Sequence, residues 1–167
     1  MRFFNSVLLA IAITLTSFVT PAAAALPGMS FLFEGQPPAD LGITDGAFKP
    51  CPASPNCVSS QATDAEHKIE PLEYSRDLET TRELLGKVLS VVPRTKVTQE
   101  DADYVRTESA SRLLGFVDDA EFYFPRDRSV IEVRSASRLG ESDLGVNRRR
   151  IEQIRLALQD LSQRLEQ

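Results

Sequence analysis

The chain has 167 residues, a formal net charge of −5 and 26% charged residues. An acidic balance of this kind argues against general nucleic-acid binding, which needs a basic surface. The length suits one compact domain with a buried core, and the composition is otherwise ordinary for a globular protein.

The first 25 residues have the pattern of a cleavable signal peptide. Arg2 precedes a run free of charge over residues 6–20, and Pro21 and the alanines at 22–25 follow, so cleavage is expected after Ala24 or Ala25. A retained anchor is the alternative. The run is shorter than the roughly 20 apolar residues that span a bilayer, so no stable membrane span is expected after processing.

Residues 26–62 are rich in proline, glycine and serine, which predicts an irregular arm before a domain at 63–167. The arm holds both cysteines, Cys51 and Cys57. In an oxidising compartment such a pair predicts a disulfide that closes a short loop. A metal site with His67 is disfavoured because no fourth soft ligand is available, and a redox-active pair usually has two intervening residues. We expect no metal and no cofactor.

The regular elements follow in series. Residues 67–74 weakly alternate apolar and polar side chains and predict a first strand, although Pro71 weakens it. Residues 77–92 carry one apolar stripe and predict a helix capped by Ser75 or Asp77. Further strands are expected at 95–99, 103–109, 113–124 and 130–137, and a last helix from Ser142 or Asp143 to about Leu165.

The predicted order is therefore β-α-β-β-β-β-α, which is typical of an α+β domain. Consecutive strands with short links favour an antiparallel sheet of about five strands. Two helices, each with one apolar face, would cover one side of it. The other side would be solvated or used for function.

Side-chain alternation distributes the acidic residues of strand 113–124 over two faces. Asp118 points with the phenylalanines, whereas Asp119 and Glu121 point the other way. Any register that pairs the phenylalanine face with the apolar face of strand 130–137 places these two carboxylates beside Arg134 and Arg138. Asp118 would be buried, level with a serine, and would need hydrogen-bond partners or a cation.

The stretch 134–150 is unusually polar for the join between a core strand and a core helix. One hypothesis is an anion site made by Arg134, Arg138 and Arg148 with free helix N–H groups. The alternative is a structural ion-pair network between arginines and carboxylates. The candidate ligand-binding residues are Arg134, Ser135, Ser137, Arg138, Asn147 and Arg148, and the supporting acidic network is Asp118, Asp119, Glu121 and Asp143.

The leading hypothesis is a non-catalytic binding or accessory protein that recognises a small anion or an acidic protein partner. A hydrolase-like enzyme using Asp118 or Glu121 with Ser135 or Ser137 is the alternative, although His67 is the single histidine and no nucleophile-elbow motif surrounds a serine. In a third possibility, residues 134–150 are purely structural, and the arm and the exposed sheet face carry the function.

Four segments resemble the family called domain of unknown function 1499: PCPASPNCVSS at 50–60, DAEHKIEPL at 64–72, GFVDDAEFYF at 115–124 and RSASRLGESDLGVNRRR at 134–150. The resemblance they mark extends over nearly all of the chain after about Gly42. The resemblance implies that the arginine, serine and aspartate positions form one site or one network, but it implies no activity. The arm LFEGQPPADLGITDGAFKP resembles members from photosynthetic bacteria, which implies the periplasm or the thylakoid lumen.

Overall fold

The computed structural model describes residues 33–165, so the predicted signal peptide lies outside the described residues. A six-stranded sheet has the order β3-β8-β7-β6-β5, with the short strand β4 also paired to β8, and β1 and β2 form a separate hairpin. The elements are β1 (Ile43–Thr44), β2 (Ala47–Phe48), β3 (Cys57–Ser59), β4 (Leu72–Glu73), α1 (Leu78–Val91), β5 (Thr95–Glu100), β6 (Tyr104–Ala110), β7 (Val117–Tyr123), β8 (Val130–Ser137) and α2 (Val146–Arg164).

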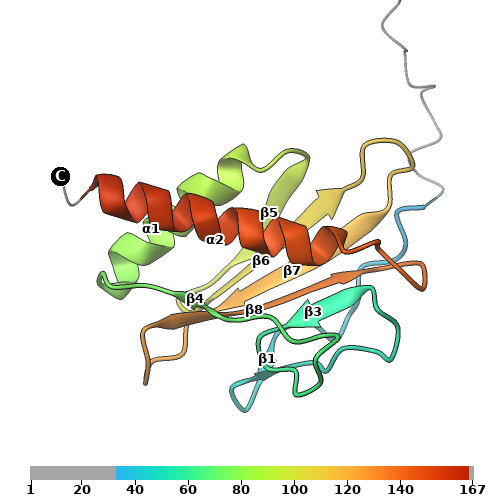
Figure 1. The fold of residues 1–167 in the computed structure, drawn as a ribbon, viewed down its shortest axis with the longest axis horizontal. Helices are drawn as coiled ribbons and strands as arrows, with labels where there is room; N and C mark the ends of the chain where they lie inside the picture. Colours follow the sequence, from blue (N-terminus) through green and yellow to red (C-terminus); the bar gives the residue numbers. More distant parts are fainter. Residues whose placement is uncertain (1–32, 166–167) are drawn as a thin grey trace, which may run out of the picture.

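This architecture confirms the predicted α+β class. The named strand pairs are antiparallel, and the two helices lie side by side over one face of the sheet (Figure 1). The expected first strand is shorter than predicted: 67–74 contributes an isolated bridge at Lys68 and then β4, which follows Pro71. Proline has no N–H to donate to a ladder, so continuous pairing through this stretch is interrupted.

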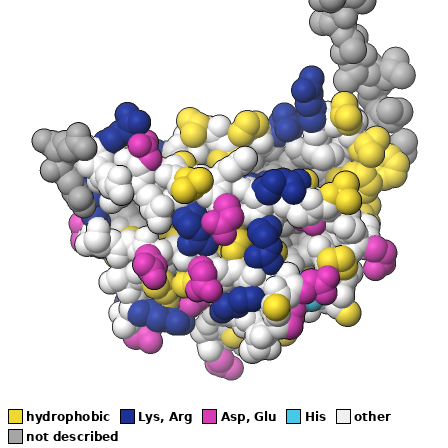
Figure 2. Space-filling model, viewed as in Figure 1, with side chains coloured by type: hydrophobic (Ala, Val, Ile, Leu, Met, Phe, Trp, Pro, Cys, Tyr) yellow, Lys and Arg dark blue, Asp and Glu magenta, His cyan; other side chains and the backbone are white. Residues whose placement is uncertain are grey.

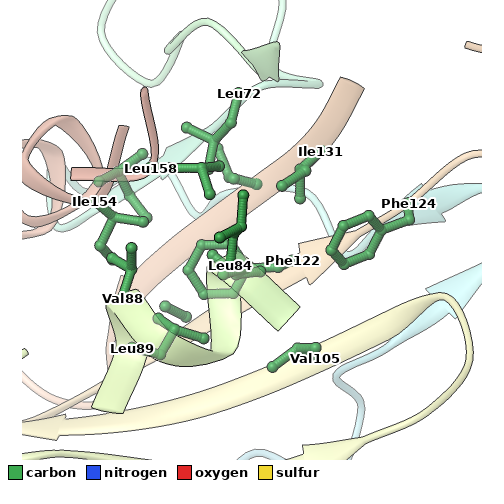
Figure 3. Close-up of a cluster of buried hydrophobic side chains, with 14 of the residues drawn as sticks. Leu72, Leu84, Val88, Leu89, Val105, Phe122, Phe124, Ile131, Ile154 and Leu158 are labelled. Carbon is green, nitrogen blue, oxygen red and sulfur yellow. The ribbon is translucent and has the colours of Figure 1, made fainter. Parts of the chain in front are cut away.

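The hydrophobic core lies between the helices and the sheet face that they cover (Figure 3). Phe122 of β7, Ile131 of β8, Leu85 of α1 and Ile151 of α2 are all 0% exposed. Each such side chain stabilises the fold by about 1.5–3 kcal/mol through removal of its apolar surface from water. This packing fixes which side chains of β7 and β8 face the helices.

The two helices begin with different caps. The side chain of Asp77 accepts a hydrogen bond from the backbone N–H of Thr80 at 2.9 Å, as one of the two predicted caps of α1. The N-cap of α2 is Gly145, in a left-handed conformation with φ 76°. Asp143 supplies the missing acceptors, because its carboxylate takes the N–H groups of Gly145 and Asn147 at 2.8 and 2.7 Å.

The arm is more regular than expected and covers part of the second sheet face. Its last residues form β3, which pairs with β8, and the predicted Cys51–Cys57 disulfide is confirmed at the start of that strand. Further back, Phe48 meets the ring of Tyr123 edge-on with centroids 6.4 Å apart. Charged side chains on this face of β7 and β8 are therefore buried beneath the arm.

Candidate functional site

Polar side chains gather on both faces of β7 and β8, and the two groups have different surroundings. The arm-side network lies beneath the arm and consists of Tyr104, Arg106, Glu108, Asp119, Glu121, Arg134 and Arg138, with Lys96 at its edge. The helix-side cluster lies under the start of α2 and consists of Asn56, Asp118, Ser135, Ser137, Asp143, Asn147 and Arg150.

Glu121 is the centre of one half of the arm-side network and is 0% exposed. Its carboxylate accepts hydrogen bonds from the backbone N–H of Gly42 at 2.8 Å, the hydroxyl of Tyr104 at 2.9 Å and Nη1 of Arg134 at 3.1 Å. Burial, together with the neighbouring Glu121 carboxylate, raises the pKa of Tyr104 above its usual range. The phenol therefore stays protonated and serves as a permanent donor.

Asp119 is the centre of the other half and lies between two guanidinium groups. Nη2 of Arg106 and Nε of Arg138 each donate to it at 2.7 Å. Arg138 also reaches Glu108 at 2.5 Å. The hydrogen bond to Asp119 is the main reason that the pKa of Arg138 is raised. These cations are thus occupied by protein carboxylates.

Glu108 gives the arm-side network a measurable acid sensitivity. Burial opposes its ionisation, but hydrogen bonds from Lys96 and Arg138 outweigh burial and lower its pKa from the ordinary 4.5. A carboxylate with a lowered folded-state pKa stabilises the fold above the unfolded-state pKa, and this contribution is lost as the pH falls through the folded-state value. We expect the free energy of unfolding to decrease as the pH drops below about 4.5. Glu108→Gln should be less stable than the native chain at pH 7 and should show a smaller decrease in acid.

Urea unfolding at a series of pH values measures this effect. Glu83→Gln, at an exposed position of α1, is the matched control and should leave the curve unchanged. An acid decline as steep in Glu108→Gln as in the native chain would show that Glu108 does not contribute.

Asn147 is the centre of the helix-side cluster and is 0% exposed. Its Oδ1 accepts from the hydroxyl of Ser135 at 2.5 Å and from Arg150 at 3.0 Å. Its Nδ2 donates to Ser137 at 3.1 Å and to Asp143 at 2.9 Å. The backbone carbonyl of Asn56 is a further acceptor at 3.3 Å, so one amide joins the arm, β8 and α2.

Asp118 lies on the helix side, level with Ser137, as the alternation predicted. It accepts from the Ser137 hydroxyl at 2.5 Å and from Arg150 at 2.6 Å. The predicted need for a cation and hydrogen-bond partners is met by these contacts. Arg150 was not singled out from the sequence, although an arginine one helical turn into α2 is placed to reach back to the sheet.

The structure brings together one pair of the hydrolase alternative, because the Ser137 hydroxyl donates to the Asp118 carboxylate at 2.5 Å, whereas Glu121 lies on the other sheet face from both serines. Ser135 and Ser137 donate to Asn147 and Asp118, and among the described residues neither is hydrogen-bonded to a histidine. His67 is engaged elsewhere, with Nδ1 2.8 Å from Asp64 and Nε2 3.2 Å from the carbonyl of Ser54. The catalytic hypothesis stays a prediction.

The three arginines of the anion-site hypothesis do not point to one place. Arg134 and Arg138 belong to the arm-side network, whereas Arg148 lies on α2 and donates to the backbone carbonyls of Lys68 and Glu66 at 2.7 and 2.8 Å. Each has protein partners, which is the arrangement that the ion-pair alternative describes. An anion site at these residues stays a prediction.

A different cavity combines cations with an apolar wall. It measures 570 Å³ and lies at the end of the sheet where β5 begins, β6 ends and β7 begins. We call it the Arg112 pocket, and its lining residues are Glu34, Arg94, Thr95, Lys96, Glu108, Ala110, Ser111, Arg112, Gly115 and Val117. Arg112 makes no hydrogen bond or ion pair with any residue that the structure describes.

Sequence reasoning missed this pocket because it assigned residues 113–124 to one strand. The strand begins at Val117, and the preceding residues form a loop in which Gly115 adopts φ 72°. The sequence Arg112-Leu113-Leu114-Gly115 could have signalled a turn at its glycine. The loop lies near Arg94, which is 18 positions earlier than Arg112 in the chain. This proximity depends on strand pairing, so no local sequence pattern could have indicated it.

Two further observations concern metals and membranes. Within residues 33–165, no three His, Cys, Asp or Glu side chains come together in a way that could hold a metal ion. In the same part of the chain, neither helix is long and apolar enough to cross a bilayer.

Fold and geometry together define an α+β domain whose sheet buries charged clusters on both faces and opens a cationic pocket at one end. The chain belongs to the family described as Protein of unknown function (DUF1499), whose model matches residues 47–158. The resemblance noted from the four sequence segments is thereby confirmed. Searches of curated proteins and of solved structures give no match.

Proposed function

We propose that the protein is a non-catalytic binding protein that holds a small amphipathic anion in the Arg112 pocket. The ligand class is a carboxylate or phosphate monoester with a short apolar chain. The observation that carries the proposal is the meeting of Arg94, Lys96 and Arg112 with an apolar wall in a cavity of 570 Å³. Ligand sites in proteins commonly have volumes of about 300–1,000 Å³ and combine apolar lining with a few polar groups.

The charge balance of the pocket favours an anion. Glu108 is one of two lining carboxylates, but it is already paired with Arg138 at 2.5 Å and with Lys96 at 2.8 Å. Glu34 is the other. Arg112 and Arg94 therefore leave an excess of positive charge, and a guanidinium is well suited to a carboxylate or phosphate.

The backbone at Arg94 gives independent support. This residue has φ 55°, a left-handed conformation that is costly for a side chain other than glycine. Its Nε donates to the carbonyl of Ala110 at 3.0 Å, which holds the guanidinium at the pocket edge. Strained residues of this kind gather at binding sites, where the conformation aims a functional side chain.

Isothermal titration with octyl phosphate tests the proposal. We expect saturable binding at one site, and Arg112→Gln should weaken it about tenfold because a charge-assisted hydrogen bond is lost. Arg126→Gln, an exposed arginine in the turn between β7 and β8 at the other end of the sheet, is the matched control. The absence of binding, or equal affinity in Arg112→Gln and the native chain, would contradict the proposal.

We also infer that the protein acts in an exported, oxidising compartment, the periplasm or the thylakoid lumen of a photosynthetic bacterium. The predicted signal peptide at residues 1–25 supports this inference, and so does the Cys51–Cys57 disulfide. The mass of the protein recovered from its own cells tests it. A chain that begins at Ala25 or Leu26 is expected, and a chain that retains Arg2 would contradict export by this route.

A further inference from the structure

Exposed leucines gather at one end of the molecule. Leu113, in the loop between β6 and β7, is 81% exposed, and Leu144, in the loop between β8 and α2, is 84% exposed. Leu114 and Leu139 in the same two loops are 43% and 42% exposed. Hydrophobic side chains cluster visibly at this end (Figure 2). Contiguous exposed apolar surface of this kind marks an interaction site more often than single exposed leucines do.

The first loop is built to hold its leucines outward. The backbone N–H of Ser111 donates to the carbonyl of Phe116 at 2.8 Å, and the N–H of Phe116 donates to the hydroxyl of Ser111 at 3.0 Å. These bonds close the base of the loop. The ring of Phe116 also packs on Phe33, with centroids 4.9 Å apart. Leu113 therefore projects from a turn whose conformation is held by these hydrogen bonds and this ring contact.

The second loop presents its leucine at a conformational cost. Leu144 has φ 53°, which glycine would adopt more easily, yet the position carries a large apolar side chain exposed to solvent. The guanidinium of Arg149 donates to the carbonyl of Leu144 at 2.8 Å. A cation is thus held directly beside the exposed leucine.

Each loop therefore has an exposed arginine beside its exposed leucine: Arg112 precedes Leu113 in the first loop, and Arg149, in the first turns of α2, contacts Leu144 of the second. We propose that these two loops dock the protein onto the surface of an anionic phospholipid bilayer. The leucines would enter the boundary between head groups and acyl chains, and the guanidinium groups would contact lipid phosphates.

Two observations favour a lipid surface over another protein. The leucines stand on projecting loops, a shape suited to insertion into a soft surface, and an arginine lies beside each of the two most exposed ones although the chain as a whole carries a net charge of −5. An acidic molecule needs a local cationic site to approach anionic lipids, and Arg112 and Arg149 supply it here. The second loop also holds two opposing charges, the exposed Glu141 and the partly buried Asp143.

The path of the chain also favours a lipid bilayer as the surface that these loops contact. The described chain begins at Phe33, and its contact with Phe116 places that beginning beside the first loop (Figure 1). The apolar run of residues 6–20 precedes it by 12 residues. While the predicted leader is attached, it is therefore joined to this end of the domain. The proposal holds whether or not the Arg112 pocket binds a ligand.

Tryptophan reporters test the docking, because the chain contains no tryptophan of its own. Leu113→Trp and Leu144→Trp place a fluorophore at each loop, and Leu156→Trp, at a leucine of α2 that is 64% exposed, is the matched control. Each protein, with the N-terminus it has in its own cells, is mixed with phosphatidylglycerol vesicles. We expect a blue shift and quenching by brominated acyl chains at positions 113 and 144, and neither change at 156.

Vesicle sedimentation then measures the contribution of each group. Leu113→Asp is expected to weaken binding at least tenfold and Arg112→Gln about fivefold, whereas Leu156→Asp should bind as the native chain does. These positions are exposed, so the substitutions leave the core intact. Absence of a blue shift at 113 and 144, an equal shift at 156, or equal binding by Leu113→Asp and the native chain would overturn the proposal.

Discussion

Replacing Arg134 with alanine is expected to destabilise the fold by about 3–5 kcal/mol, because it leaves a buried carboxylate without its cation. Glu121 is 0% exposed and would retain Gly42 and Tyr104 as donors but no neutralising charge. The substitution also removes the hydrogen bond from Nε to the carbonyl of Lys49 at 2.9 Å, which ties the arm to β8. Urea unfolding at pH 7 measures the loss.

Two further variants separate this effect from a general loss of charge. Arg164→Ala removes an arginine that is 70% exposed and pairs with Asp160, and it should leave stability nearly unchanged. Arg134→Ala combined with Glu121→Gln removes the stranded charge and should recover part of the loss. If Arg134→Ala folds with undiminished stability, the arm-side network is not structural and the anion-site hypothesis at Arg134 gains support.

Asn147→Ala is the second substitution with a large expected effect, a loss of about 3 kcal/mol. The amide makes contacts with Ser135, Ser137, Asp143 and Arg150, and Ser135 is 0% exposed, so removal of the amide leaves buried polar groups without partners. Each such group costs about 1–3 kcal/mol. Hydrogen exchange should report the loss first in the opening turn of α2.

Gln153→Ala, at an exposed position on the same helix, is the matched control for Asn147 and should leave stability nearly unchanged. Asn147→Asp keeps the acceptor but loses the amide donors and adds a charge beside Asp143 and Asp118, so it should be at least as damaging as alanine. Equal stability of Asn147→Ala and the native chain would show that the cluster does not hold α2 to the sheet.

The sequence predicts which side chains of β7 and β8 share a sheet face, because the alternation of side chains along a strand is a local property. Once the phenylalanine face of β7 pairs with the apolar face of β8, Glu121 must share a face with Arg134, and Asp118 must share one with Ser135 and Ser137. The structure then fixes the register, with Glu121 opposite Arg134 and Asp118 opposite Ser137. Burial of Asp118 follows from its place on the core face, whereas burial of Glu121 could not be predicted. It depends on the arm, whose hairpin strands are two residues long and carry almost no periodic signal.

The candidate site was less predictable than the fold. Polar composition drew attention to Arg134, Arg138 and Arg148, yet composition does not distinguish an arginine with a protein partner from one that is free. Arg112 has no hydrogen-bond or ion-pair partner among the described residues, and it precedes two leucines that made this stretch resemble a strand. Its meeting with Arg94 and Lys96 arises from the pairing of β5 with β6, a tertiary feature.

The two proposals place function at the same end of the sheet but rest on different atoms. The Arg112 pocket depends on Arg94 and the cavity walls, whereas bilayer docking depends on the exposed leucines. Arg112 belongs to both, so its substitution alone does not separate them. Leu144→Asp does, because Leu144 does not line the pocket and its loss should affect vesicle binding without affecting octyl phosphate binding.

We propose that the protein carries a small anionic ligand in the Arg112 pocket. Native mass spectrometry of the protein, purified gently from the cells that produce it, would detect such a ligand as bound mass. We predict an additional bound mass in the native chain and in Arg126→Gln that is absent from Arg112→Gln. A bare polypeptide in all three spectra, or a bound mass that survives in Arg112→Gln, would contradict the account.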